Sequence, residues 1–184
     1  LLAFLILIQF NFLTISLGMA SMIFAFSYPF MKRITYWPQL FLGLTFNWGI
    51  VMAWTAIHND ISLNILLLYL SAIFWTLGYD TIYGAQDIKD DEIIGVKSTS
   101  IKFKKNIKLF VSTSYSLMII LITFLFLKDF GINLFSSLFL IFVISLAIQL
   151  IIFDLKNPKN CLKAFKINNF SGLFLFLSIL SKSF

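Results

Sequence analysis

Long apolar stretches recur along the chain, and short polar loops separate them. A helix that crosses a membrane needs about 20 mainly apolar residues, because the hydrocarbon core is about 30 Å thick. The stretches are continuous, without the residue-by-residue alternation of a membrane β-barrel. The pattern therefore predicts an all-α, polytopic transmembrane helix bundle. The seven windows that predict helices are Leu1–Leu13, Thr14–Phe30, Pro38–Ile57, Ser62–Tyr83, Ile107–Leu127, Asn133–Phe153 and Phe165–Ser181.

The composition excludes the soluble classes of protein. Hydrophobic residues make up 60% of the 184 residues and charged residues 12%, whereas soluble domains have about 25% charged residues. A soluble enzyme, a disordered tail and a secreted disulfide scaffold are therefore ruled out. The single cysteine, Cys161, has no partner for an intrachain disulfide. We interpret the net charge of +6 as a signal of loop orientation, and we expect no nucleic-acid binding.

The basic residues predict how the chain is oriented in the membrane. Twelve of the 14 lysines and arginines fall in alternate loops, after the second, fourth and sixth windows. The positive-inside rule makes these loops cytoplasmic, and we expect a bacterial inner (plasma) membrane. The twelve residues are Lys32, Arg33, Lys89, Lys97, Lys102, Lys104, Lys105, Lys108, Lys156, Lys159, Lys163 and Lys166.

Five of the eight acidic residues lie between Asp80 and Glu92, at the predicted cytoplasmic end of the fourth window. At about 100° per residue, Asp80, Asp87 and Asp91 form one stripe if the helix continues through Asp91. Stacked like charges destabilise a helix, and a carboxylate at membrane depth is costly. Mg²⁺ offsets this cost, since it prefers oxygen ligands and commonly binds one or two carboxylates together with substrate phosphates. The pattern predicts a metal–phosphate site; the alternative is a solvated acidic helix end paired with the lysines that follow.

Two further stretches suit an anionic ligand. The loop Gly95–Thr99 offers Lys97 and two hydroxyl groups that can neutralise phosphate oxygens, although an ordinary cytoplasmic loop has a similar composition. Tyr28 and Lys32 are four residues apart and share one face if that segment is helical. An aromatic residue followed by a basic one is also typical of a membrane anchor.

The sequence resembles the UbiA superfamily of membrane prenyltransferases, and within it the 4-hydroxybenzoate polyprenyltransferase branch. Four stretches carry the resemblance, which covers essentially the whole chain: YPFMKR at 28–33, NWGIVMAW at 47–54, YDTIYGAQDIKDDEIIGVKST at 79–99 and CLKAFKINNFSGLFLF at 161–176. The resemblance implies a bundle of nine membrane helices around a cavity that opens toward the cytoplasm and the lipid. It also implies two aspartate-rich motifs that bind Mg²⁺ and the diphosphate of an isoprenoid donor.

The resemblance also implies roles for individual residues. The acidic segment looks like the second aspartate-rich motif, the segment beginning at Tyr28 looks like a YxxxK element near the diphosphate, and Lys97 stands where the family has a basic residue. The implied metal ligands are Asp80, Asp87 and Asp91; the implied diphosphate-binding residues are Tyr28, Lys32 and Lys97; the implied catalytic residues are Asp87, Asp91 and Lys97.

The activity implied by the resemblance is an aromatic prenyl transfer in ubiquinone biosynthesis. A polyprenyl group would pass from polyprenyl diphosphate to the ring carbon next to the phenol of 4-hydroxybenzoate, within the lipid bilayer. Three alternatives stay open: another UbiA-type aromatic prenyltransferase, an ion-coupled membrane transporter, and an inactive remnant. A transporter would place polar residues at mid-depth in several helices.

One departure from the family pattern shapes these expectations. The first aspartate-rich motif, NDxxDxxxD, is absent, and the Asn59–Asp60 pair lies in a loop predicted on the opposite side of the membrane. We therefore expect residues 1–184 to form a single membrane-embedded prenyltransferase domain that lacks two N-terminal helices and the first motif. About seven of the family's nine helices would be present, and this chain alone would be inactive.

Overall fold

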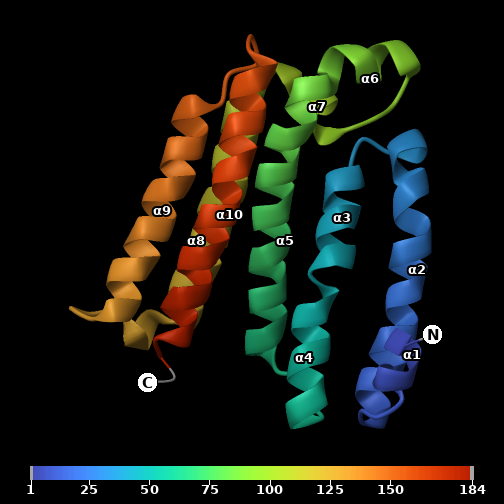
Figure 1. Cartoon of the computed structure of the whole chain (residues 1–184), viewed down its shortest axis with the longest axis vertical. Helices are drawn as coiled ribbons and strands as arrows, with labels where there is room; N and C mark the ends of the chain where they lie inside the picture. The colour runs from blue at the N-terminus through green and yellow to red at the C-terminus, as the bar shows by residue number, and fades with distance from the viewer. Residues whose placement is uncertain (1, 183–184) are drawn as a thin grey trace.

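The computed structural model describes residues 2–182 and arranges them as long helices that run side by side (Figure 1). No strand occurs among these residues, so the predicted all-α fold is confirmed. Short 3₁₀ turns lie at 85–87, 104–106 and 127–129. The helices are α1 (Leu2–Leu7), α2 (Phe12–Ile34), α3 (Pro38–Phe46), α4 (Trp48–His58), α5 (Leu63–Gly84), α6 (Ile88–Ile94), α7 (Thr99–Lys102), α8 (Ile107–Leu125), α9 (Leu134–Ile152) and α10 (Pro158–Leu180).

The long helices have the length and composition of membrane spans. In the described part of the chain, five helical segments are long and apolar enough to cross a membrane: Phe12–Ile34, Pro38–His58, Leu63–Ile94, Lys104–Leu125 and Leu134–Ile152. Helix α10 is as long as α2, but three lysines and three asparagines between residues 159 and 169 lower its mean hydropathy. It runs beside α9 along the bundle (Figure 1).

The first predicted helix differs from the structure. Helix α1 has only six residues, which is about 9 Å and too short to cross a membrane. The chain then turns, and Asn11 caps α2: its Oδ1 accepts the Thr14 N–H at 2.9 Å and its Nδ2 donates to the Thr55 carbonyl at 2.7 Å. A helix over Leu1–Leu13 is therefore wrong for residues 2–13, because Asn11 starts the next helix. Leu1 lies outside the described residues.

The predicted helix at Pro38–Ile57 is broken in two. Pro38 occupies the first turn of α3, as expected, because a missing N–H costs nothing there. The break falls at Asn47, whose Nδ2 donates to the Gly43 carbonyl at 2.9 Å and to Thr76 Oγ1 at 2.8 Å. Such bonds are needed because the polar groups freed by a helix break must be satisfied inside a membrane.

Helix α5 is central to the bundle. It contacts α3 and α4 on one side and α8 and α10 on the other, while α2 and α9 lie at the two flanks (Figure 1). Its partner α8 contributes the fully buried Tyr115 and Met118, and α9 contributes Phe142 and Leu146. The helix that carries Asp80 is thus held by packing on both sides.

The two ends of the bundle differ in charge. The C-terminal ends of α2 and α9 lie at the same end of the bundle as α6 and α7, which is the upper end in Figure 1. This end carries the three lysine-rich loops that the sequence predicted on one side. The loop with Asn59 and Asp60 and the ion pair between Asp129 and Lys182, at 2.6 Å, lie at the opposite end.

Candidate functional site

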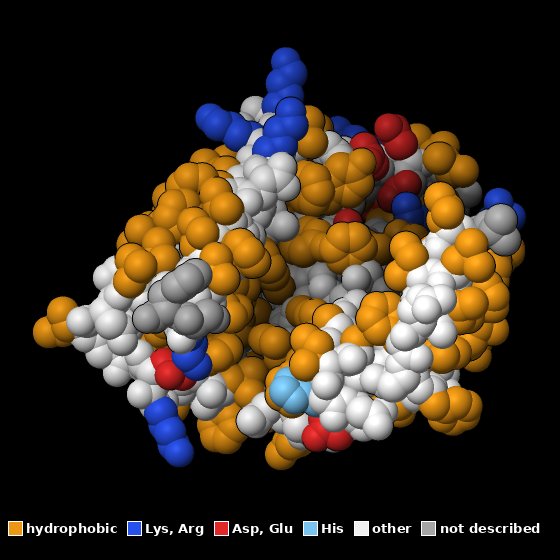
Figure 2. All heavy atoms as spheres, turned by 60° about the horizontal axis from the view of Figure 1, so that its bottom comes forward, with side chains coloured by type: hydrophobic (Ala, Val, Ile, Leu, Met, Phe, Trp, Pro, Cys, Tyr) orange, Lys and Arg blue, Asp and Glu red, His pale blue; other side chains and the backbone are white. Residues whose placement is uncertain are grey.

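A small polar cavity of about 110 Å³ lies at the lysine-rich end of the bundle. Figure 2 shows acidic and basic side chains gathered along one edge of a hollow in a largely hydrophobic surface. The end of α2, the start of α3, the segment from the end of α5 into α6, and the loop before α7 all contribute to the cavity. It brings together all six site residues predicted from the sequence: Tyr28, Lys32, Asp80, Asp87, Asp91 and Lys97.

The three aspartates reach the cavity by a different geometry from the one predicted. Helix α5 ends at Gly84, a 3₁₀ turn follows, and Asp87 leaves helical geometry at φ −107° and ψ 8° before α6 begins. The continuous helical stripe is therefore wrong, because this turn redirects α6 across the end of the bundle (Figure 1). Asp80 and Asp91 are nevertheless partly buried in the same cavity as the exposed Asp87.

Helix α2 places one aromatic and one cationic side chain in the cavity. Pro29 lies inside α2 without ending it, so Tyr28 and Lys32 share a face as predicted. The positive charge of Lys32 attracts the carboxylates of both Asp80 and Asp91 and favours their ionised form. The cation of α2 is thus close enough to α5 and α6 to offset part of their negative charge.

The cavity carboxylates are not neutralised by direct ion pairs. Among residues 2–182 the ion pairs are Lys104 with Glu92 at 2.8 Å and Lys182 with Asp129 at 2.6 Å. The alternative interpretation, in which the acidic helix end is paired with the lysines that follow, therefore holds for Glu92 alone among the described acidic residues of this segment. The oxygens of Asp80, Asp87 and Asp91 stay available for a cation.

The loop before α7 is tied to the end of α2. The Lys97 N–H donates to the Lys32 carbonyl at 2.8 Å, and Lys97 Nζ donates to the Ile34 carbonyl at 3.1 Å. Gly95 ends α6 in the left-handed region at φ 77°, which a side chain would strain. The Lys97 ammonium has three donors, so the bond to Ile34 leaves others for an anion.

The chemistry of these side chains fits a divalent cation that is shared with a ligand. Within residues 2–182, no three His, Cys, Asp or Glu side chains gather closely enough to hold a metal ion by themselves. Mg²⁺ commonly takes only one or two carboxylates and completes its coordination with substrate phosphates and water. Three aspartates and two lysines around one cavity suit that arrangement better than a closed metal cage made by the protein alone.

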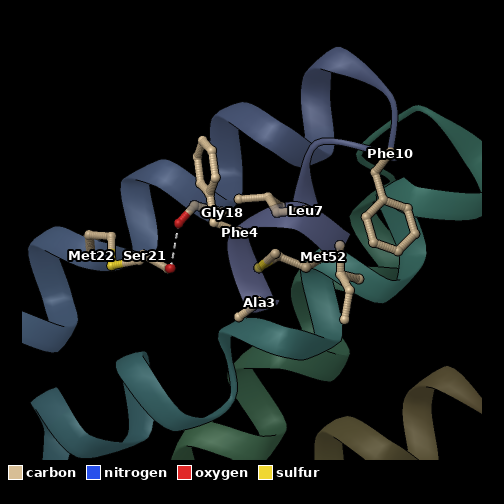
Figure 3. Close-up of a pocket in the computed structure, with 9 residues that line it drawn as sticks. Ala3, Phe4, Leu7, Phe10, Gly18, Ser21, Met22 and Met52 are labelled. Atoms are coloured by element: carbon tan, nitrogen blue, oxygen red, sulfur yellow. Dashed lines mark hydrogen bonds between the residues drawn. The ribbon is translucent and has the colours of Figure 1, made fainter. Parts of the chain in front are cut away.

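A larger pocket, of about 360 Å³, lies between α1, α2 and α4 and is shown in Figure 3. Its lining includes Phe4, Leu7 and Met52 and no titratable side chain. Its one hydroxyl, on Ser21, donates to the Gly18 carbonyl at 2.6 Å (Figure 3). This pocket offers no group for acid–base or phosphate chemistry, so its lining suits only apolar groups. The candidate active site is therefore the smaller polar cavity.

Comparison with known protein families identifies the family of the chain. The sequence model of the UbiA prenyltransferase family matches residues 1–178, which include every predicted site residue. The chain belongs to the UbiA prenyltransferase family. The family expected from the YPFMKR segment and the aspartate-rich segment is thereby confirmed.

Named relatives within the UbiA family share about two residues in five with the chain. The 4-hydroxybenzoate polyprenyltransferase, mitochondrial, of Bos taurus is 39% identical over 95% of this chain and 47% of its own length. The protein of the same name in Arabidopsis thaliana is 41% identical over 97% of this chain and 44% of its own length. The chain thus spans about half the length of these curated relatives. Their mitochondrial names give no support to the expected bacterial inner membrane.

A solved structure shows the same UbiA fold. The apo structure of a UbiA homolog from Aeropyrum pernix K1 matches 98% of this chain and 68% of its own chain, with a TM-score of 0.73 and 20% identity. This likeness confirms the all-helical fold.

Sequence reasoning missed several residues of this UbiA cavity. Gln39 lines it although only 4% of the residue is exposed, and Tyr83 lines it too. Ser98, one of the two hydroxyl residues expected in the loop Gly95–Thr99, also lines it. Helical spacing offered a signal for Tyr83, which is three residues after Asp80. Gln39 gave only the weak signal of a lone amide in an apolar window.

Proposed function

We propose that the protein, at its natural full length, transfers a polyprenyl group from polyprenyl diphosphate to the ring carbon next to the phenol of 4-hydroxybenzoate. One observation carries the proposal: the six residues implied by the family resemblance line one cavity at one membrane face. The acceptor comes from the names of the relatives. The proposed setting is a membrane: either a mitochondrial membrane, since the names of the relatives include the word mitochondrial, or the bacterial inner membrane expected from the sequence.

In this proposal the aspartates hold Mg²⁺ and the basic residues hold the diphosphate. Asp80, Asp87 and Asp91 would supply the carboxylate ligands, and bound Mg²⁺ would act as a Lewis acid on the leaving diphosphate. Lys32 and Lys97 would donate charge-assisted hydrogen bonds to diphosphate oxygens. They would thereby stabilise the negative charge that develops as the allylic C–O bond breaks.

The arrangement of polar groups argues against a transporter. Three polar side chains inside α8, α9 and α10 are uncharged and bonded to one another: Tyr115 Oη donates to Gln149 Oε1 at 2.6 Å, and Gln149 Nε2 donates to Ser171 Oγ at 2.9 Å. Ionisable side chains within the membrane segments typically mark an ion pathway. The lysines and carboxylates of the described residues lie instead toward the two ends of the bundle, and most of the lysines are at the cavity end.

The test is prenylation of 4-hydroxybenzoate by membranes that contain the full-length protein, Mg²⁺ and a polyprenyl diphosphate. We expect Asp87→Asn and Asp91→Asn each to lower turnover by about 10²-fold or more, as losses of electrostatic stabilisation do. Removing divalent cations with EDTA should abolish turnover. Asp129→Asn, at the opposite end of the bundle, is the matched control and should leave turnover unchanged.

Two outcomes would contradict the proposal in different ways. Undiminished turnover by Asp87→Asn and Asp91→Asn would show that the cavity is not the active site. Prenylation of a different phenol, with 4-hydroxybenzoate left unchanged, would keep the site and identify another UbiA-type aromatic prenyltransferase.

A further inference from the structure

Gln39 is a buried polar residue of the cavity that the proposed function does not use. It lies in the first turn of α3, and its residue surface is 4% exposed. Its Oε1 accepts the backbone N–H of Thr99 at 2.9 Å. A backbone N–H can only donate, so the oxygen and not the nitrogen must face Thr99. This bond fixes the orientation of the amide.

The amide nitrogen consequently faces away from Thr99. Among the described residues Nε2 has no hydrogen-bond partner, and it is not one of the unpartnered side-chain atoms that are sealed from solvent. A Cβ placed on Gly84 would lie 3.3 Å from Nε2, and Gly84 itself lines the cavity. The NH₂ group therefore lies beside the cavity wall between the turn of Asp80 and the turn of Asp87.

The bond to Thr99 alone does not account for this buried amide. Helix α7 is already attached to α5 by two other contacts, since Thr81 Oγ1 and Thr99 Oγ1 are 2.7 Å apart and Ser100 Oγ donates to the Thr81 carbonyl at 2.8 Å. Nε2 is open to the cavity and has no acceptor among the described residues, so its N–H groups are free to donate to a ligand oxygen that enters the cavity.

We propose that Gln39 binds the substrate's diphosphate group, with Nε2 donating a hydrogen bond to one of its oxygens. Lys32 and Lys97 line the same cavity and carry positive charge, so the three side chains together favour an anion with several acceptor oxygens. Gln39 adds a neutral donor with a fixed direction. The two lysines therefore attract the negative charge of the anion, and Gln39 fixes its position. This inference rests on the proposed function, because it gives that site one more diphosphate-binding residue.

The experiment compares three variants of the full-length protein in detergent. Gln39→Glu keeps an acceptor for the Thr99 N–H but replaces the two donors by a carboxylate. Gln39→Met removes both donors without adding charge. Ser100→Ala is the matched control, because it loosens the same junction between α5 and α7 without changing a cavity donor. The probe is inorganic diphosphate with Mg²⁺, whose binding is followed by its concentration-dependent rise in Tm.

We expect both Gln39 variants to bind inorganic diphosphate about tenfold or more weakly than the unaltered protein, since a hydrogen bond to a charged group has about that effect on affinity. The KM for polyprenyl diphosphate should rise by a similar factor, while the KM for 4-hydroxybenzoate should not change. Ser100→Ala should lower the Tm of the free protein without changing diphosphate affinity. A purely structural role of Gln39 would give the Ser100→Ala pattern in all three variants.

The two proposals can fail separately. Unchanged diphosphate affinity and KM in Gln39→Met would overturn the role of Gln39, and this neutral variant decides if Gln39→Glu does not fold. Diphosphate binding by the unaltered protein without prenylation of 4-hydroxybenzoate would overturn the proposed function, while the binding comparison would still decide on Gln39. A lack of diphosphate binding by the unaltered protein would overturn both.

Discussion

At the scale of single residues, Gly78 determines how closely α5 and α8 approach each other. A Cβ on Gly78 would lie 2.4 Å from Cε1 and 2.7 Å from Cδ1 of the Tyr115 ring, which is closer than carbon atoms pack. The ring cannot move aside easily, because Tyr115 is 2% exposed and its hydroxyl donates to Gln149. The position of the aspartate-bearing helix thus depends on the absence of one side chain.

We expect Gly78→Ala to destabilise the protein by roughly 1–3 kcal/mol, as overpacking of a dense core does. Gly49→Ala is the matched control, since nothing lies within 4 Å of a Cβ placed there. It should change stability by less than about 1 kcal/mol, because alanine is the better helix former. Thermal unfolding of the two variants in the same detergent measures the difference. Equal midpoints would show that Tyr115 yields to the added methyl group.

Residues that carry charge in an apolar chain can be found from the sequence, whereas residues that matter through contacts cannot. Lys32 and Asp80 stand out because a membrane segment tolerates few ionisable groups, and the structure does place both in one cavity. Gln39 and Gly78 depend on partners far along the chain, at Thr99 and Tyr115. No local pattern reports those pairings.

At the scale of elements, the positions of the long helices follow from hydropathy but their breaks do not. Asn11 and Asn47 interrupt predicted apolar windows, and each is stabilised at its break by a bond to another helix, to the Thr55 carbonyl and to Thr76 Oγ1. A polar residue in an apolar run is compatible with either a break or a continuous helix. The choice depends on whether tertiary partners satisfy the freed backbone.

A buried polar network joins the last three long helices. Tyr115 of α8 bonds to Gln149 of α9, and Gln149 and Ser145 of α9 both bond to Ser171 Oγ of α10, at 2.9 Å and 2.7 Å. All four residues are at most 3% exposed. Removing one partner leaves another buried polar group without a hydrogen bond, so the network favours one packing of these helices over others.

We expect Gln149→Leu to destabilise the protein by about 1 kcal/mol, the usual size for interhelical hydrogen bonds in membranes. The double variant Tyr115→Phe/Gln149→Leu should cost less than the sum of the two single variants. Each single variant leaves one buried polar group without its partner, whereas the double variant removes both groups. Unfolding of all four proteins of the cycle in detergent measures the coupling. Strictly additive losses would contradict a direct interaction between the two side chains.

At the scale of the whole molecule, the distribution of charge unites orientation and site. The structure places the lysine-rich loops at the same end as the cavity, which the alternation of basic loops predicted. It also places Asp60 at the other end, where it accepts a hydrogen bond from Trp54 Nε1 at 2.9 Å. Asp60 is thus committed to a contact far from the cavity. Loop charge is predictable because it depends on chain order alone, whereas the shape of the cavity depends on the turn between α5 and α6.

The orientation makes a prediction for the protein in sealed membrane vesicles. The variant Lys156→Cys, in the loop before α10, should react with a membrane-impermeant maleimide only from the side that the positive-inside rule makes cytoplasmic. Cysteine at position 61 (Ile61→Cys), in the loop after α4, should react only from the opposite side. Both positions are exposed, and Cys161→Ser provides a background without the native thiol, which is buried. Labelling of both positions from one side would contradict an odd number of membrane crossings between them.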